Sequence, residues 1–175
     1  VIDSVTFSPD GKLLAFTDGS LHVWRLEPNS LEAEAESPSQ EILNIPNAAF
    51  ARFSPDGNRL AAVSGNKIKV WDTATGRELL TLSGHTGWIM GLDFSPDGRQ
   101  LASASLDGTL RVWSLAPGQE TVTVSSPVTG YGTRVVYNPN GKEFATNGGD
   151  GTTILWNAET GEQRVILAGH HLEVI

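Results

Sequence analysis

Short runs in which apolar and polar residues alternate recur along the chain. In GLDFS, Leu92 and Phe94 alternate with polar neighbours, and the PDG that follows favours a turn because proline presets φ and glycine accepts positive φ. Two more short runs, LASAS and TLRVW, follow and are separated by LDG. This period of two is typical of β-strands, and no segment offers a convincing long helix. The pattern predicts an all-β chain of short strands joined by tight turns.

The same group of strands recurs at a nearly constant period. The motif FSPDG, or its drifted form YNPNG, starts at intervals of 46, 41 and 43 residues, at Phe7, Phe53, Phe94 and Tyr137. Runs that end in tryptophan keep the same period, at intervals of 47, 42 and 43 residues, and they end at Trp24, Trp71, Trp113 and Trp156. A fourth strand fits ELLTL at 78–82, TVTV at 121–124 and RVIL at 164–167. Four short strands in each unit of this length are typical of a propeller blade.

We therefore expect a β-propeller built of four-stranded antiparallel blades, with four blades present. The predicted blades span 1–46, 47–83, 84–125 and 126–168, and GHHLEVI at 169–175 starts a fifth unit. A blade cannot bury both of its apolar faces alone, so neighbouring blades must cover them.

The motifs GH, SPDG and LASAS, together with DGT and the VW that follows it, resemble those of the WD-repeat β-propeller family, and their uniformity resembles that of its bacterial multidomain members. Only Trp71-Asp72 shows the literal WD pair, and GH occurs at Gly84-His85 and Gly169-His170. The first two units have shortened second hairpins, FTDGSLHVW and VSGNKIKVW. Rings of this family often have seven blades. The resemblance thus implies an incomplete ring and further blades of a parent chain, with a closed four-bladed ring as the alternative.

One group of residues has the composition of a nucleophilic triad. Ser103, His85 and Asp107 supply the serine, histidine and aspartate that such a triad needs. No G-x-S-x-G elbow surrounds the serine, however. The resemblance instead makes His85, Ser103, Asp107 and Trp113 a hydrogen-bonded structural tetrad, in which the buried indole N–H finds an acceptor.

The spacing of this group returns in the fourth unit. Thr146 and Asp150 stand ten and six residues before Trp156, as Ser103 and Asp107 stand before Trp113. The matching histidine position is occupied by a valine at 128. Recurrence beside successive tryptophans favours an architectural role, so we expect no enzyme activity and no catalytic residue.

Residues that break the repeat are the candidates for partner binding. Trp88 is the one tryptophan of five that is out of phase with the repeat, and Tyr131 takes the same place in the next unit. Leu106, just before Asp107, is a further candidate on the same face. Aromatic side chains at a rim suit protein recognition, although both could simply cap the ends of inner strands.

An acidic insertion also interrupts the repeat. The stretch from Arg25 to Glu41 carries five glutamates and no basic residue after Arg25. It could attract a basic partner or a metal, but a solvated insertion between strands three and four is the reading we favour.

Composition narrows the function further. An apolar content of 39% with 18% charged residues is typical of a globular chain. The formal charge of −8 argues against nucleic acid, whose binders carry a basic footprint. We find no long apolar stretch and no signal-peptide pattern, so we expect no membrane partner and a cytoplasmic location. The chain begins without methionine, inside an alternating segment, and resembles an excised piece.

We expect neither a metal nor a cofactor. Zero cysteines exclude disulfides and thiolate metal sites. GGDGTT at 148–153 lacks the lysine and the spacing of a phosphate loop. His170 of the pair His170-His171 fits the histidine position of the tetrad, so we expect no zinc site there, and Asp10, Asp56 and Asp97 belong to turns.

The function we predict is a non-enzymatic scaffold that binds a protein or peptide through its loop face. One alternative is the propeller of a serine peptidase or of a periplasmic translocation protein, which also uses repeats of the form SPDG followed by LAF, as in Lys12 to Phe16. A sugar-binding propeller is a weaker third. The in-phase tryptophans and GH favour the WD-repeat family.

Overall fold

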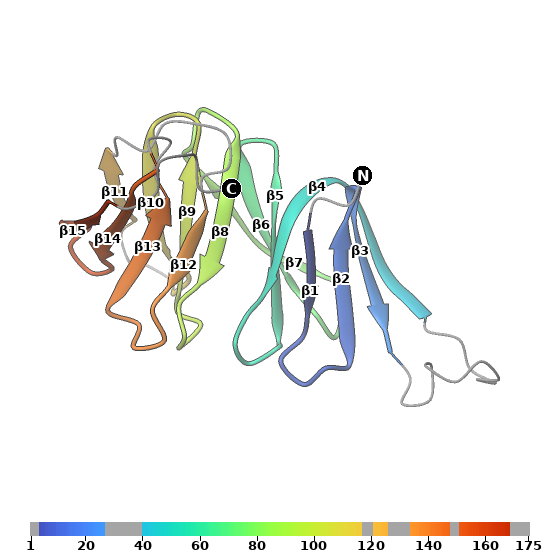
Figure 1. Cartoon of the computed structure of the whole chain (residues 1–175). Coiled ribbons are helices and arrows are strands. Elements are labelled where there is room, and N and C mark those ends of the chain that lie inside the picture. Colours follow the sequence, from blue (N-terminus) through green and yellow to red (C-terminus); the bar gives the residue numbers. More distant parts are fainter. Residues whose placement is uncertain (1–3, 27–39, 117–120, 126–133, 148–150, 169–175) are drawn as a thin grey trace. The chain divides into compact units, whose positions relative to one another are not determined.

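The computed structural model describes residues 4–26, 40–116, 121–125, 134–147 and 151–168. Within these ranges the chain forms strands joined by turns, and no helix occurs, so the prediction of an all-β fold is confirmed (Figure 1). The strands are β1 (Ser4–Phe7), β2 (Leu13–Thr17), β3 (Gly19–Arg25), β4 (Gln40–Phe53), β5 (Arg59–Ser64), β6 (Lys67–Asp72), β7 (Glu78–Ser83), β8 (Ile89–Phe94), β9 (Gln100–Ser105), β10 (Thr109–Ser114), β11 (Val122–Ser125), β12 (Val135–Tyr137), β13 (Glu143–Asn147), β14 (Thr153–Asn157) and β15 (Gln163–Leu167). The chain divides into two compact units, Val1–Thr81 and Leu82–Ile175.

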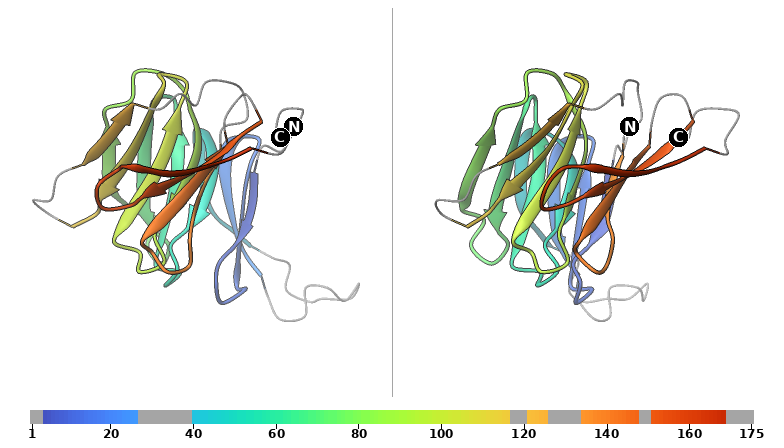
Figure 2. Two further views of the ribbon diagram at one scale, coloured as in Figure 1. Left: turned by 60° about the vertical axis from the view of Figure 1, so that its left-hand side comes forward. Right: turned by 90° about the vertical axis from the view of Figure 1, so that its left-hand side faces the viewer.

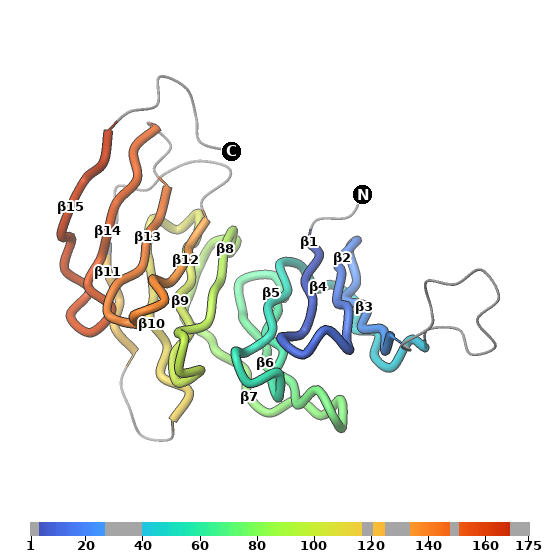
Figure 3. The backbone as a smooth tube through the Cα atoms, turned by 60° about the horizontal axis from the view of Figure 1, so that its bottom comes forward, coloured from blue at the N-terminus to red at the C-terminus, as the bar shows by residue number. Residues whose placement is uncertain are grey.

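The first unit contains the first two predicted blades, and they share a strand. Strands β1 to β7 form one antiparallel sheet in sequence order. The long strand β4 pairs with β3 as far as Ala48 and with β5 from Ala49 onward. Asn47 and Phe50, on either side of this change of partner, have positive φ, 57° and 48°; the course of β4 from β3 to β5 can be followed in Figure 3. The strand that ends the first blade thus continues as the strand that opens the second, so each blade has four strands and the two blades share β4.

The core of the first unit lies between its two blades. Ala15, Leu21 and Val23 of the first blade pack with Leu60 and Trp71 of the second. All five side chains are buried, and in β2 and β3 they alternate with more exposed neighbours. Tryptophan from one blade thus covers small and branched residues of the blade before it.

The second unit repeats this packing with two separate four-stranded sheets, as predicted. The orders are β11-β10-β9-β8 and β12-β13-β14-β15, and the two sheets lie against each other in both views of Figure 2. Trp156 and Phe144 of the second sheet stack with centroids 6.4 Å apart. They pack with Ala102, Ala104 and Val112 of the first sheet. Alanine and valine on one face leave room for the aromatic rings of the next.

The repeated SPDG motif is a self-contained turn. The Ser95 hydroxyl donates to Asp97 at 2.7 Å and accepts from the backbone N–H of Gln100 at 2.9 Å. The Asp97 carboxylate also accepts from the backbone N–H of Arg99 at 3.0 Å. The hydrogen bond from Ser95 is the main reason that the pKa of Asp97 lies below its usual range. The same contacts recur at 8–13 and 54–59, so the motif serves to join strands.

Candidate functional site

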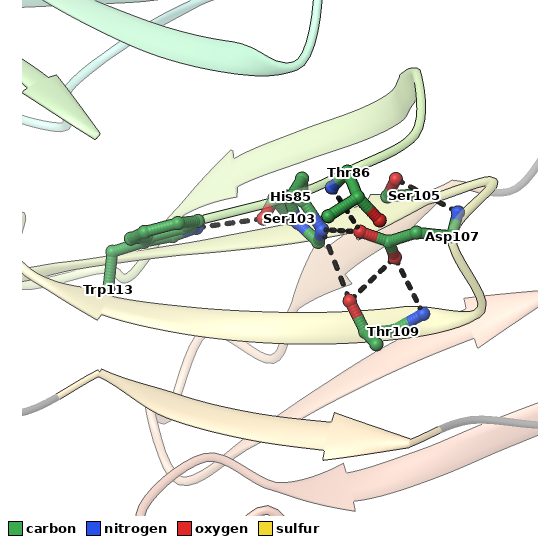
Figure 4. Close-up of polar contacts among 7 residues, drawn as sticks. All are labelled: His85, Thr86, Ser103, Ser105, Asp107, Thr109 and Trp113. Atoms are coloured by element: carbon green, nitrogen blue, oxygen red, sulfur yellow. Dashed lines mark hydrogen bonds and ion pairs between the residues drawn. The ribbon is translucent and has the colours of Figure 1, made fainter. Parts of the chain in front are cut away.

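The structure brings His85, Ser103, Asp107 and Trp113 together in the β8–β11 blade (Figure 4). The indole Nε1 of Trp113 lies 2.8 Å from the Ser103 hydroxyl, which lies 2.8 Å from Nε2 of His85. Nδ1 of His85 lies 2.9 Å from Oδ2 of Asp107. The four side chains form a continuous chain of hydrogen bonds between strands β9 and β10 and the loop before β8.

A neutral His85 satisfies every donor and acceptor in this chain. The indole N–H of Trp113 can only donate, so Ser103 accepts from it, and the Ser103 hydroxyl can then donate to Nε2 of His85. The imidazole proton then lies on Nδ1 and is donated to Asp107. The tetrad is thus fully satisfied with a neutral histidine and an ionised aspartate.

The pKa shifts agree with this assignment. Burial lowers the pKa of His85 and outweighs the opposing effect of the neighbouring Asp107. Burial alone would raise the pKa of Asp107, but hydrogen bonds from Thr109, the Thr86 backbone and His85 hold it well below its usual range. Each group therefore keeps, near neutral pH, the protonation state that the tetrad requires.

These distances are also those of a catalytic triad, and burial separates the two interpretations. Ser103 is 1% exposed and His85 is 2% exposed. The serine oxygen is already engaged by the tryptophan indole. A nucleophile has to reach a substrate in a cleft. The Ser103 hydroxyl is instead buried, and its hydrogen bonds go to the side chains of Trp113 and His85.

The blade β12–β15 carries a shorter version of the same arrangement. Nε1 of Trp156 donates to the Thr146 hydroxyl at 2.8 Å, and Thr146 is 1% exposed. The two other predicted positions, Asp150 and the valine at 128, lie outside the described residues. The indole and hydroxyl are paired here as they are in the preceding blade.

Neither blade of the compact unit Val1–Thr81 has a hydroxyl side chain at the position equivalent to Ser103 and Thr146. Ser103 and Thr146 each stand two residues after the residue that pairs with the tryptophan. By the same register the position holds Phe16 in the first blade and Ala62 in the second. Among the described residues nothing accepts a hydrogen bond from the buried Nε1 of Trp24.

A different histidine network occupies the first blade, and the sequence analysis missed it. His22 lies with Nδ1 2.5 Å from Glu41 and Nε2 3.1 Å from Asp18. Its ring stacks on Phe16 with centroids 4.8 Å apart, and Asn44 reaches Nδ1 at 3.3 Å. The hydrogen bond with Glu41 is the largest cause of the raised pKa of His22. The TDGS turn was a usable signal, because the hairpin it closes pairs His22 with Phe16.

The predicted rim residues are exposed where the structure describes them. Trp88 is 74% exposed and Leu106 is 42% exposed. The backbone N–H of Leu106 donates to the carbonyl of Trp88 at 2.8 Å, which ties the two loops together. Gly87 permits this approach, because a Cβ there would lie 2.7 Å from the Asp107 backbone nitrogen. Tyr131 lies outside the described residues.

The acidic insertion also lies mostly outside the described residues. Its last glutamate, Glu41, pairs in register with Trp24 near the start of β4 and contacts His22. Within the described ranges no cluster of three or more histidine or acidic side chains could hold a metal ion. In that part of the chain we also find no helix with the length and hydropathy needed to span a bilayer.

Comparison with known families decides the classification. The family model described as WD domain, G-beta repeat, matches residues 2–25, 48–72 and 76–114. The chain belongs to the WD-repeat family. The fourth WD-repeat unit lies beyond the matched ranges, yet it keeps the four-stranded sheet and the Thr146–Trp156 hydrogen bond.

The chain spans only a small part of the length of each curated relative that it matches. Coronin-7 of Mus musculus is 34% identical over 137 residues, covering 74% of this chain and 14% of that protein. Nuclear distribution protein PAC1 of Trichophyton verrucosum is 34% identical over 134 residues, covering 62% of this chain and 28% of that protein. Lissencephaly-1 homolog 1 of Paramecium tetraurelia is 51% identical over 59 residues, covering 33% of this chain and 15% of that protein. These relatives are eukaryotic, so they give no support to the resemblance to bacterial members.

Proposed function

We propose that this WD-repeat chain is a non-enzymatic scaffold that binds another protein or a peptide through the rim formed by Trp88 and Leu106. The observation that carries the proposal is the exposure of a large aromatic side chain, 74% for Trp88, on a loop that the tetrad holds in place. Exposed tryptophan beside leucine supplies a large contact area with few rotatable bonds.

The tetrad is what makes this rim rigid. The Asp107 carboxylate accepts from the backbone N–H of Thr86, one residue before Gly87, at 2.9 Å. It also accepts from the backbone N–H and hydroxyl of Thr109 at 2.9 and 2.6 Å. Both loops that carry the rim residues are therefore fixed before a partner arrives, which lowers the entropy lost on binding.

Substitution at the rim tests the proposal. We expect Trp88→Ala and Leu106→Ala to reduce recovery of specific partners in quantitative affinity purification, and Tyr131→Ala to do the same if that residue shares the rim. Val136→Ala is the matched control, because Val136 is 59% exposed on β12 and is not a rim residue. Equal partner recovery from the control and from both rim variants would discard the rim.

The proposed absence of catalysis has its own test. We expect a fluorophosphonate probe for reactive serines to leave Ser103 unlabelled in the folded protein, because the hydroxyl is buried and engaged by Trp113. Stoichiometric labelling of Ser103, read by peptide mass spectrometry, would contradict the structural role. The family match favours the WD-repeat reading over the peptidase propeller, and membership of a larger ring stays a prediction.

A further inference from the structure

The first unit contains an open groove that the proposed function does not use. It has a volume of about 730 Å³ and lies among the turn after β1, the end of β3 and the turn after β4. The two SPDG turns, at 8–11 and 54–57, form two of its borders. Pockets that bind ligands in proteins commonly have volumes of roughly 300–1,000 Å³.

Hydrogen bonds to backbone carbonyls hold the borders of this groove in place. The N–H of Leu26 donates to the carbonyl of Lys12 at 2.8 Å. The Thr73 hydroxyl donates to the carbonyl of Gly57 at 2.7 Å. A Cβ at Gly57 would lie 3.5 Å from Cδ of Pro9, so the two SPDG turns are in close contact. The groove is thus preformed rather than assembled by a ligand.

The charged side chains of the groove differ in how far they are already engaged. The carboxylate of Asp10 accepts from the Ser8 hydroxyl at 2.6 Å, and that of Asp56 accepts from the Ser54 hydroxyl at 2.5 Å. Each also accepts from a backbone N–H of its own turn, at 3.1 Å. These two carboxylates are satisfied within their turns.

The two cations that line the groove are less engaged. The Lys12 ammonium lies 3.9 Å from Asp10, and both side chains are more than half exposed, so this pair is weak. No described residue accepts a hydrogen bond from the Arg25 guanidinium. Arg25 pairs in register with Leu13, the residue after Lys12, which brings the two cations to neighbouring strands. An incoming carboxylate would thus meet two donors that have no strong partner among the described residues.

We propose that this groove binds a short extended peptide that carries an aspartate or glutamate next to an apolar residue. Lys12 and Arg25 supply charge-assisted hydrogen bonds to the carboxylate, and the arginine fork suits bidentate contact. Pro9, Leu13 and Leu26 line the same groove and supply apolar surface. Because the groove is open to solvent, an extended chain suits it better than an enclosed small molecule, which would be mostly buried in its site.

Fluorescence anisotropy tests the proposal on the intact chain. The probe is a fluorescein-labelled peptide with two glutamates beside a leucine, and its counterpart has glutamines in their place. We expect saturable binding of the glutamate peptide at low salt and at least ~10-fold weaker binding of the glutamine peptide, as lost charge-assisted hydrogen bonds require. Raising the salt concentration should weaken the first peptide more than the second.

Variants locate the site. Arg25→Gln and Lys12→Gln should each weaken the glutamate peptide several-fold, and the double variant at least ~10-fold. Arg99→Gln is the matched control, because Arg99 follows the equivalent turn in the third blade and does not line this groove. Near-UV circular dichroism establishes that each variant is folded.

The possible outcomes separate this proposal from the proposed rim. Equal affinity for the two peptides would overturn the proposal that the groove binds the glutamate peptide. Equal losses of affinity in Arg99→Gln and Arg25→Gln would also overturn it, since both results indicate unspecific electrostatic attraction. Trp88→Ala should bind the glutamate peptide like the wild type. Loss of binding in Trp88→Ala with no loss in Arg25→Gln would move the peptide to the rim and likewise overturn the groove.

Discussion

The two units of the chain solve the same packing problem with different chemistry around their tryptophans. In the second unit the indole N–H groups of Trp113 and Trp156 each donate to a buried hydroxyl at 2.8 Å. In the first unit the equivalent positions hold Phe16 and Ala62, and Nε1 of Trp24 has no acceptor among the described residues. In both units each strand nevertheless pairs antiparallel with its neighbours in the sequence. The repeated strand pattern builds the sheet, and the polar tetrad is an addition to it.

Magnitudes explain why the first unit can dispense with the tetrad. Burying a large aromatic side chain of 150–250 Å² is worth roughly 4–6 kcal/mol before chain entropy is subtracted. A single hydrogen bond contributes about 1 kcal/mol net. Apolar packing between neighbouring blades therefore dominates, and the tetrad adds precision to the loops that it joins.

The largest effect we expect comes from removing a packed tryptophan. Trp113→Ala should destabilise the second unit by about 3–5 kcal/mol, the usual cost of deleting a buried aromatic side chain. Trp113 is 4% exposed, whereas Trp24 is only partly buried, so Trp24→Ala should cost the first unit less. Hydrogen exchange of amides in β9 and β2 measures the two units separately. An equal loss of protection in both variants would remove the distinction drawn between them.

The next effect isolates the hydroxyl. Ser103→Ala should cost the second unit about 2 kcal/mol, because it leaves the Trp113 N–H and Nε2 of His85 buried without partners. Ala62→Ser, which introduces a hydroxyl at the equivalent place beside Trp71, should change the first unit by less than about 1 kcal/mol. The same exchange experiment reads both variants. A larger loss in Ala62→Ser than in Ser103→Ala would contradict the assigned register.

The two histidines should give the units opposite responses to pH. The folded pKa of His22 is raised above 6.5, chiefly by Glu41, so its contribution to stability is complete below pH 6.5 and is lost as pH rises through the raised value. The folded pKa of His85 is lowered by burial, so its contribution is complete above pH 6.5 and declines as pH falls through and below that value. Asp18 and Glu41 are the charged groups that face His22.

NMR titration of the imidazole resonances measures these two shifts directly. The His22 signal should titrate above pH 6.5 and the His85 signal below it, and His22→Gln and His85→Gln identify the two resonances. If both histidines titrate on the same side of pH 6.5, the contrast between His22, which faces two exposed carboxylates, and His85, which lies in the buried tetrad, is wrong.

The smallest effect should come from the exposed tryptophan. Trp88→Ala should change the unfolding free energy by at most about 0.5 kcal/mol, as is usual for surface substitutions, because Trp88 is 74% exposed. Its indole should also be quenched by acrylamide more readily than the indoles of Trp113 and Trp156. A destabilisation as large as that of Trp113→Ala would show that Trp88 is part of a core rather than a rim.

The sequence predicted the strands because they repeat at a fixed period, and its resemblance to the WD-repeat family implied the tetrad of His85, Ser103, Asp107 and Trp113. It did not predict that β4 runs on from the first blade into the second, because NIPNA at 44–48 contains no glycine, and the positive φ just before the change of partner falls on Asn47. The His22 network and the groove were not foreseen. Their members come from different turns and strands, and nothing periodic in the sequence relates Asp18 to Glu41, or Lys12 to Arg25.

The continuous strand β4 has a mechanical consequence. Because Gln40–Phe53 belongs to both blades of the first unit, a pull on one blade loads the hydrogen bonds of the other through a single covalent segment. One proteolytic cut near Pro46 would uncouple them, leaving each half with a loose border strand. The segment of β4 near Pro46 is therefore where we expect both an applied force and a protease to separate the two blades.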